Sequence, residues 1–323
     1  MKELKEKINQ AVSSIRSKTS LVPEVGLILG SGLGVLADEI EDKVVIKYGE
    51  IKNFPLSTVE GHAGAFVSFF IAFKTGSPVL ALTGAVITGL LFGLIMAFAS
   101  ITMKGDQEIN GIGIYILGMG LSGLFFRLTM GSIAQTKGFS PFPVPLLSKI
   151  PFIGEILFNQ NCMVYFALLL VPLSWFILFK TTWGLKIRAT GENPHAADSL
   201  GVSVEKTRYI CVITGSILAA LAGAFLTIGQ EEAAFVDNIA GGRGFIAVAL
   251  VYFGRWNPFG IMGGAFLFSM IDALQLRLQV LNIGIPYEYA VMAPYIITIL
   301  ALIFVTGKAR GPSALGKVFA REG

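Results

Sequence analysis

The sequence predicts an all-α polytopic membrane protein of about seven or eight membrane segments, preceded by a short, incomplete α/β fragment. Hydrophobic residues make up 54% of the chain and charged residues only 14%, against about 25% charged residues in soluble domains. The composition also changes abruptly near His62, because the first 62 residues hold 17 of the 46 charged side chains. The two sides of this position therefore call for separate interpretation.

Six apolar runs after His62 are each close to the about 20 residues that a bilayer-spanning helix needs. They cover residues 79–103, 109–130, 163–179, 209–228, 259–281 and 287–305. Two shorter runs differ from these. Residues 63–73 would form a helix of only about 16 Å, which cannot cross a membrane unaided. Residues 244–252 are flanked by glycine, which indicates a broken or re-entrant helix or the start of a span that runs to Trp256.

Basic residues in the short loops predict the orientation, because cytoplasmic loops are enriched in Lys and Arg. Five such residues lie between 180 and 208, and four lie between 308 and 321. This pattern places the 104–108 turn, the 183–208 loop and both termini in the cytoplasm and the Pro-rich 135–160 segment outside. The net charge of +4 is small, and the basic residues lie near the ends of the apolar runs, so we expect no nucleic-acid partner. Cys162 and Cys211 stand alone, which favours neither a metal nor a redox site.

The loop at 183–208 contains the signals of a short helix between two spans. Asn and Pro side by side are typical of a helix start, with Pro at the first helical position, and Gly is typical of a stop. A short cytoplasmic helix of this kind can dock into another protein, although a simple capped turn between two helices fits the same pattern. The residues concerned are Asn193, Pro194, Ala196, Ala197, Leu200 and Gly201.

Two motifs identify a family. The run GLKIRATGENPHAADSLGVS and the later run GGRGFIAVALVYFGRWNPFGIMGGAFLF resemble the permease subunits of ABC importers in the branched-chain amino acid and ribose translocator superfamily. Within it, permeases that work with basic-membrane-protein-type nucleoside-binding lipoproteins are the nearest in pattern. The likeness covers about residues 64–310, and SITMKGDQEINGIGIYILGMGLSG fits it as well.

The resemblance implies a transporter membrane subunit rather than an enzyme, located as a multi-pass protein in the cell (cytoplasmic) membrane. Its implied partners are an ABC ATPase, a second permease subunit and an extracytoplasmic substrate-binding lipoprotein. Asn193 would cap a coupling helix that ends at Gly201, and Ala196 and Ala197 would give close contact with the ATPase. The chain contains no GxxxxGK[ST] sequence, so ATP hydrolysis is expected in the partner, with no cofactor and no metal in this chain.

Four residues in the apolar region are candidates for the translocation pathway. Charged residues within membrane segments are often functional, and glycine turns there leave backbone groups available. Snorkelling near a span end, pairing with a neighbouring helix and a purely structural helix break are the alternatives. The candidates are Gly242, Arg243, Asp272 and Arg277.

The segment before the composition change contains a second pair of motifs. VGLILGSGLG reads as a buried strand that runs into a Gly-rich turn, and with FPLSTVEGHAG it is similar to the opening of trimeric purine nucleoside phosphorylases. The resemblance implies that Ser31 and His62 are vestigial phosphate contacts. The parts of that family that bind purine and ribose have no counterpart here, so the resemblance does not favour residual phosphorylase activity.

The two resemblances predict three parts: a truncated phosphorylase-like cytoplasmic fragment at 1–64, a permease domain without its first helices at 65–310, and a cytoplasmic tail at 311–323. We interpret this order as a gene fusion. Neighbouring bacterial genes often share a substrate, which favours nucleosides as the cargo. A sugar or branched-chain amino acid permease, or a nonfunctional fusion, are the alternatives.

Overall fold

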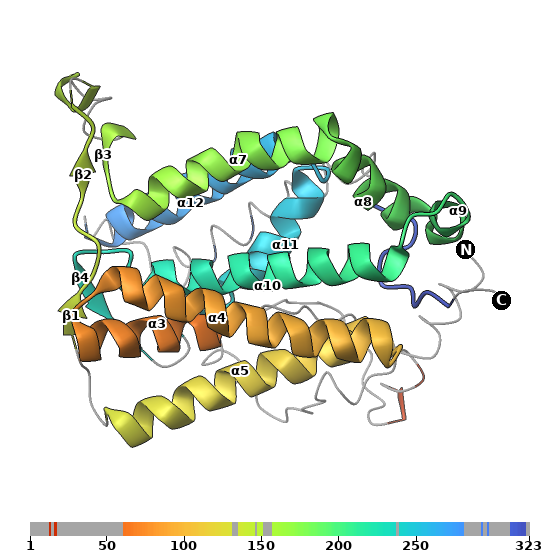
Figure 1. The fold of residues 1–323 in the computed structure, drawn as a ribbon. Coiled ribbons are helices and arrows are strands. Elements are labelled where there is room, and N and C mark those ends of the chain that lie inside the picture. Colours follow the sequence, from red (N-terminus) through yellow and green to blue (C-terminus); the bar gives the residue numbers. More distant parts are fainter. Residues whose placement is uncertain are drawn as a thin grey trace.

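The computed structural model describes residues 61–130, 135–145, 147–150, 157–236, 239–280 and 311–320, together with residues 13, 16, 17, 292 and 296. Helices dominate this part of the chain (Figure 1). They are α3 (Gly61–Thr75), α4 (Pro78–Ala97), the π-helix η2 (Phe98–Thr102), α5 (Gln107–Thr129), the 3-10 helix η3 (Leu147–Lys149), α7 (Cys162–Lys180), α8 (Thr182–Glu192), α9 (Pro194–Ser199), α10 (Val204–Ile228), α11 (Arg243–Phe253) and α12 (Pro258–Val280).

Five of these helices are long and apolar enough to cross a membrane, which makes the chain a multi-pass membrane protein. They are Pro78–Thr102, Gln107–Thr129, Cys162–Lys180, Val204–Ile228 and Pro258–Gln275. The spans expected at 79–103, 109–130, 163–179, 209–228 and 259–281 are thereby confirmed as helices. The span expected at 287–305 lies outside the described residues, as does the predicted α/β fragment, and the total of about seven or eight segments stays a prediction.

Two apolar helices are too short to cross the bilayer. Helix α3 has 15 residues and α11 has 11, which correspond to about 22 Å and about 16 Å of helix. Both lengths are below the ~30 Å of the hydrocarbon core. The short apolar runs at 63–73 and 244–252 therefore form short helices, as their lengths predicted.

Side chains at the helix starts satisfy the first free backbone N–H groups. Ser77 accepts from the N–H of Leu80 and precedes Pro78 at the first turn of α4. Asp106 accepts from the N–H groups of Glu108 and Ile109 at 2.9 and 3.1 Å, which starts α5 directly after the turn that leaves η2. Ser77 and Asp106 thus define the N-terminal ends of the spans that begin with α4 and α5.

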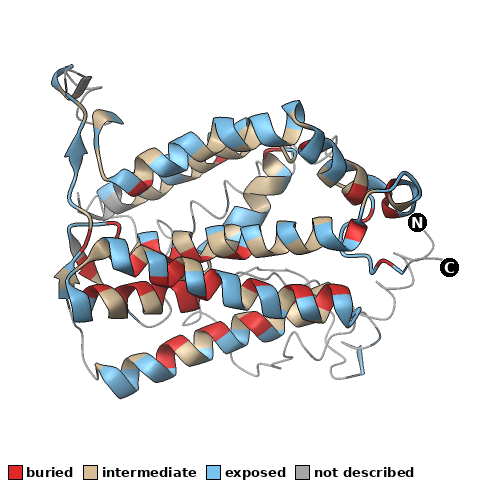
Figure 2. Ribbon diagram, viewed as in Figure 1, coloured by how far each residue is buried: buried red, intermediate tan, exposed pale blue. Residues whose placement is uncertain are grey.

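The core is formed where α10 packs against α3 and α4 (Figure 2). Small residues allow the backbones to approach closely, as in membrane helix pairs generally. A Cβ added to Gly64 would lie 2.6–2.7 Å from the backbone and Cβ of Ala220, and one added to Gly89 would lie 2.7–2.9 Å from Ile217, Ser216 and Ala220. Buried hydroxyls reinforce the contact, since Ser68 and Thr227 lie 3.1 Å apart and Thr227 donates to the carbonyl of Ala65.

An aromatic cluster extends this core towards the loop that follows α10. Phe235 is 1% exposed and its ring lies 4.9 Å from that of Phe126, 5.6 Å from Phe66 and 6.0 Å from Phe69. Edge and tilted arrangements of this kind are favourable for aromatic pairs. The cluster ties α3, α5 and the loop after α10 into one body.

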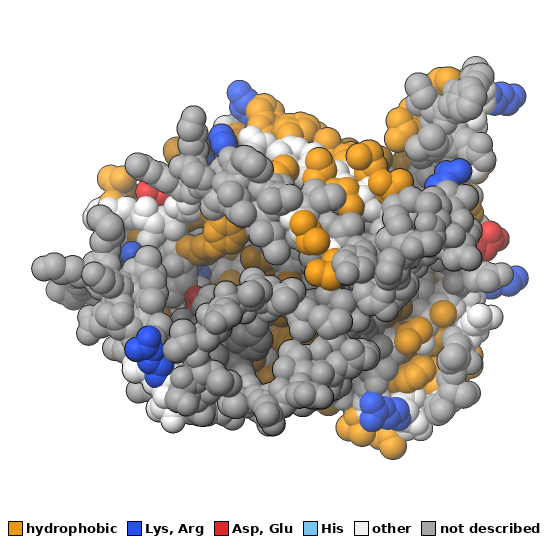
Figure 3. All heavy atoms as spheres, turned by 180° about the vertical axis from the view of Figure 1, so that it is seen from behind, with side chains coloured by type: hydrophobic (Ala, Val, Ile, Leu, Met, Phe, Trp, Pro, Cys, Tyr) orange, Lys and Arg blue, Asp and Glu red, His pale blue; other side chains and the backbone are white. Residues whose placement is uncertain are grey.

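The outer faces of the spans expose large apolar side chains, among them Leu128, Leu169 and Met270. Figure 3 shows such side chains gathered along the upper part of the molecule, where α7 and α12 run in Figure 1. In water such faces would be costly, whereas lipid tails solvate them. The exposed apolar surface is thus the expected lipid-facing surface of a membrane protein.

The loops separate into two ends (Figure 1). One end carries two small antiparallel sheets, in which β1 (Gln135–Lys137) pairs with β4 (Glu232–Ala234) and β2 (Phe142–Pro143) pairs with β3 (Asn159–Gln160). The other end carries the 103–106 turn, α8, α9 and the segment 311–320. This is the same grouping of loops that the positive charges predicted.

Candidate coupling elbow and the adjoining cavity

Residues 181–203, here called the elbow, join α7 to α10 at one end of the bundle. Thr181 accepts from the N–H of Gly184 at 3.1 Å and donates to the carbonyl of Ile177 at 2.6 Å, so the chain leaves α7 and begins α8 with one linking residue. Helix α8 then ends at Glu192, and Asn193 separates it from α9. The elbow is thus two consecutive short helices held between two spans.

Helix α9 is built as its sequence predicted. The Oδ1 atom of Asn193 accepts from the N–H of Ala196 at 3.1 Å, and Pro194 is the first helical residue. The helix ends at Ser199, and Gly201 follows with φ of 80°. The predicted short helix is therefore confirmed, with its last helical residue two positions before Gly201.

The two faces of α9 differ in exposure. Pro194 and Ala197 are buried, whereas His195, Ala196 and Ser199 are exposed and Leu200 is 83% exposed. The sequence prediction had grouped Ala196 and Ala197 as contacts with a partner. That grouping is corrected for Ala197, which is 3% exposed because its side chain, rotated about 100° from Ala196 around the helix axis, packs in a cluster with Val204 and Phe319. Ala196 and Leu200 remain available to another protein.

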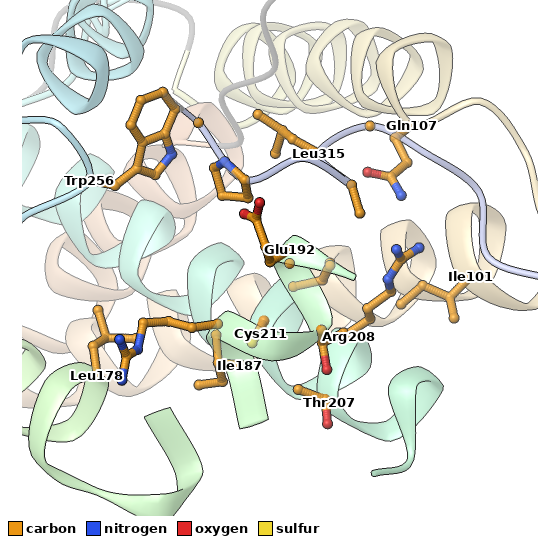
Figure 4. A pocket seen from close by; sticks show the side chains of 18 of the residues that line it. Ile101, Gln107, Leu178, Ile187, Glu192, Thr207, Arg208, Cys211, Trp256 and Leu315 are labelled. Carbon is orange, nitrogen blue, oxygen red and sulfur yellow. The ribbon is translucent and has the colours of Figure 1, made fainter. Parts of the chain in front are cut away.

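A cavity of about 690 Å³ lies beside the elbow (Figure 4). Its walls come from the ends of α4 and α7, from α8, from the start of α10, from the turn between α11 and α12, and from the segment 311–316. Most of the lining is apolar, and Gln107, Glu192 and Arg208 are among its polar side chains. Gln107 is the first residue of α5, so the cavity joins the elbow to four of the spans.

Thr190 adds a polar group to this lining. Its side chain is 4% exposed, and within the described part of the chain its hydroxyl has no hydrogen-bond partner. A buried hydroxyl without a partner is costly, and a water molecule bound in the adjoining cavity is one way to satisfy it. The sequence alone carried no signal for this residue, since a threonine in a helix is ordinary.

The predicted pathway residues lie at the start of α11 and on α12. Gly242, with φ of 79°, starts α11, and Arg243 is exposed and donates to the carbonyl of Ile239 at 3.3 Å. Asp272 is half-buried and Arg277 is exposed, both on α12. These four residues therefore belong to two consecutive helices, which contact each other.

His62, predicted as a vestigial phosphate contact, lies in the first turn of α3 and is 5% exposed. Its ring meets the ring of Tyr115 edge-on at 5.5 Å, so it is packed between membrane helices. Ser31, its predicted companion, lies outside the described residues. No group of three or more His, Cys, Asp or Glu side chains that could hold a metal ion occurs in the part that the structure describes.

The fold and the elbow together define a multi-pass helical membrane protein with two short helices, α8 and α9, between two of its spans. The model of the family described as the permease component of branched-chain amino acid transport systems matches residues 44–302. The chain belongs to this family of transport permeases.

Three relatives cover most of the chain. It is 38% identical over 270 residues, 78% of this chain and 83% of the relative, to the guanosine ABC transporter permease protein NupQ of Bacillus subtilis. It is 37% identical to a putative glucose ABC transporter permease protein of Haloferax volcanii, over 69% of this chain and 68% of the relative. It is 36% identical to the nucleoside ABC transporter permease protein NupC of Lactococcus lactis, over 76% of this chain and 78% of the relative. No solved structure matches the chain.

A short part of the chain is similar to a different protein. Over 60 residues, 19% of this chain and 22% of the relative, it is 60% identical to purine nucleoside phosphorylase 1 of Geobacillus stearothermophilus. The resemblance to a phosphorylase fragment is therefore confirmed as a likeness to about a fifth of such an enzyme.

Proposed function

We propose that this chain is the membrane-spanning subunit of an ABC importer for nucleosides, driven by a separate ATPase that docks on the 183–208 loop. The observation that carries the proposal is the elbow: a capped helix with an exposed apolar residue, Leu200, held between two spans of a permease-family protein. A partner that presses on α9 would act on α7 and α10 together, because both spans continue directly into the elbow. Transmission is then mechanical and needs no catalytic residue in this chain.

Two independent likenesses support nucleosides as the cargo. Two of the similar permeases are named for guanosine and for nucleosides, and the phosphorylase-like segment belongs to a class of enzymes that act on purine nucleosides. A sugar is the second candidate, since a putative glucose permease is 37% identical. A chain that inserts but does not transport is the third.

The orientation is part of the proposal. The elbow end carries Lys186, Arg188 and Lys206, so the positive-inside rule places it in the cytoplasm, and the two small sheets then face outside. The extracytoplasmic end would receive substrate from a binding lipoprotein. A second permease subunit would complete the pore against the exposed faces of the spans, with Gly242, Arg243, Asp272 and Arg277 as candidate pathway residues.

We also propose that residues 1–64 form a phosphorylase-like cytoplasmic fragment that is no longer an enzyme, followed by the permease domain at 65–310 and a tail at 311–323. The permease family match begins at residue 44, so it overlaps the proposed phosphorylase-like fragment over residues 44–64. Helix α3 begins at Gly61, inside this overlap. Gly64 and His62 would then serve packing of the membrane domain, whatever their ancestral role.

Uptake of labelled guanosine tests the function. Cells without other nucleoside uptake would express the chain with its ATPase, its partner permease and its binding protein. We expect uptake that is lost when the P-loop lysine of the ATPase is substituted and that unlabelled nucleosides suppress. Suppression by glucose instead would overturn the nucleoside assignment, and absence of uptake by membrane-inserted protein would support a nonfunctional fusion.

A further inference from the structure

We infer that the segment 311–320 is a brace that positions the coupling helix α9 for the ATPase, with Phe319 as its main positioning residue. The inference rests on the proposed function. It assigns a role to a part of the chain that the sequence indicated only as a tail. The argument starts from the contacts that this segment makes at the elbow end of the bundle.

Hydrogen bonds attach the segment to the end of α8. The hydroxyl of Ser313 donates to Glu192 Oε1 at 2.7 Å, and the Ser313 N–H lies 3.4 Å from Oε2 of the same carboxylate. The N–H of Ala314 donates to the carbonyl of Gly191 at 2.9 Å. Since Glu192 is the last residue of α8 and directly precedes the α9 cap, these bonds hold the joint between the two helices.

Phe319 packs under the coupling helix. It is 8% exposed and forms a small apolar cluster with Ala197 of α9 and Val204 of α10, which are 3% and 1% exposed. The ring of His195 lies 5.1 Å from the Phe319 ring. The buried face of α9 is therefore covered by the segment 311–320 and by the start of α10.

Arg208 joins the segment to α10. Its Nη1 donates to the carbonyl of Lys317 at 2.9 Å, and its guanidinium lies 6.0 Å from the centre of the Phe319 ring. At the other end of the segment, a Cβ on Gly311 would lie 2.8 Å from the Trp256 ring in the turn between α11 and α12. One ten-residue stretch thus contacts α8, α9, α10 and that turn.

A helix as short as α9 depends on its neighbours for its stability and its orientation. Isolated helices below about 12–15 residues are marginal in water, and α9 has six. Its cap at Asn193 fixes where it starts, but its angle to the spans depends on what covers its buried face. Removing the Phe319 ring takes away the contact from the segment 311–320 and leaves Ala197 only the residues of its cluster near α8 and α10, so α9 can tilt and present Leu200 differently.

The test measures the docking of α9 in the complete transporter. A photoreactive phenylalanine derivative replaces Leu200, and its crosslinks to the ATPase are counted per permease molecule in the membrane. In Phe319→Ala we expect about tenfold fewer crosslinks, which corresponds to ~1.4 kcal/mol, and a similar decrease in the maximal rate of guanosine uptake. The substrate concentration at half-maximal uptake should not change, because the binding protein meets the opposite end.

Val318→Ala is the matched control, because Val318 is the neighbouring residue and is 44% exposed. It should crosslink and transport as the unaltered chain does. Phe319→Tyr keeps the ring and should restore crosslinking. Ser313→Ala removes the 2.7 Å bond to Glu192 and should lower crosslinking less than Phe319→Ala, whereas Ser203→Ala, at a helix start without a side-chain cap, should have no effect.

The outcomes separate the two proposals. If the chain that carries only the photoreactive residue at position 200 gives no crosslinks to an ATPase and the unaltered chain gives no uptake, the proposed function fails. If the chain with only the photoreactive residue crosslinks and Phe319→Ala crosslinks equally well per molecule, the brace is wrong and the function stands. Should Phe319→Ala not reach the membrane, Ser313→Ala decides in its place, and undiminished crosslinking there overturns the brace.

Discussion

Gly64 offers the sharpest test of the packing, because the sequence placed it in the phosphorylase-like fragment and the structure places it between membrane helices. Gly64 lies in α3, and a Cβ added there would lie 2.6 Å from the carbonyl oxygen of Ala220 and 2.7 Å from its Cα and Cβ. Backbone atoms of α10 cannot rotate away as the end of a long side chain can. Gly64→Ala must therefore push α3 and α10 apart.

The size of the effect follows from this geometry. Carbon atoms in contact lie about 3.5–4.0 Å apart, so the helices must separate by about 1 Å. Overpacking of a tight contact costs about 1–3 kcal/mol, and the better helix propensity of alanine offsets about 1 kcal/mol of this. The difference is a net loss of about 0–2 kcal/mol. Separation of the helices also weakens the hydrogen bond of Thr227 to the carbonyl of Ala65, which spans the same contact and adds to the loss.

The assay is thermal unfolding of the detergent-solubilised protein, followed by the loss of the monodisperse peak in size-exclusion chromatography. The matched control is Gly215→Ala on α10, where an added Cβ meets no atom within 4 Å. The control should unfold at the same temperature as the unaltered chain or higher, and Gly64→Ala at a lower one. An unchanged or raised midpoint for Gly64→Ala would refute the close packing of α3 on α10.

Three further predictions follow from the same structure. Asn193→Ala removes the bond to the Ala196 N–H and should destabilise α9 by about 1 kcal/mol, seen as reduced uptake with unchanged protein in the membrane. Phe235→Ala removes a 1% exposed ring at the centre of the aromatic cluster and should lower stability by about 3–5 kcal/mol; a thermal midpoint like that of the unaltered chain would contradict that cluster. In a chain with its two cysteines replaced, Ser140→Cys should react with a membrane-impermeant maleimide from outside intact cells and Ser199→Cys only after lysis; the reverse pattern would overturn the orientation.

Much of the fold follows from local sequence. The spans were predictable because a bilayer requires about 20 apolar residues in a row, which a single sequence displays. The start of α9 was predictable as well, because Asn193 and Pro194 act on groups within one helical turn. The short length of 63–73 likewise indicated a helix that does not cross the bilayer alone.

The remaining features depend on partners that are distant in the sequence. Ala196 and Ala197 are equivalent in sequence, and packing against Val204 and Phe319 buries only Ala197. His62 reads as a phosphate contact beside its neighbours in the chain, but it lies against Tyr115 once α3 joins the bundle. Thr190 is unremarkable until α8 folds beside the cavity.

The class of protein, five of the spans, the short helix in the elbow and the family can be predicted from the amino-acid sequence, because they depend on composition and on residues close together in the chain. Which side of α9 is exposed, and that the segment 311–320 covers its other side, follow from the folded structure alone. Burial of a helix face is set by whatever packs against it. For α9 that neighbour stands more than a hundred residues away in the sequence, as the bond between Glu192 and Ser313, 121 positions apart, illustrates.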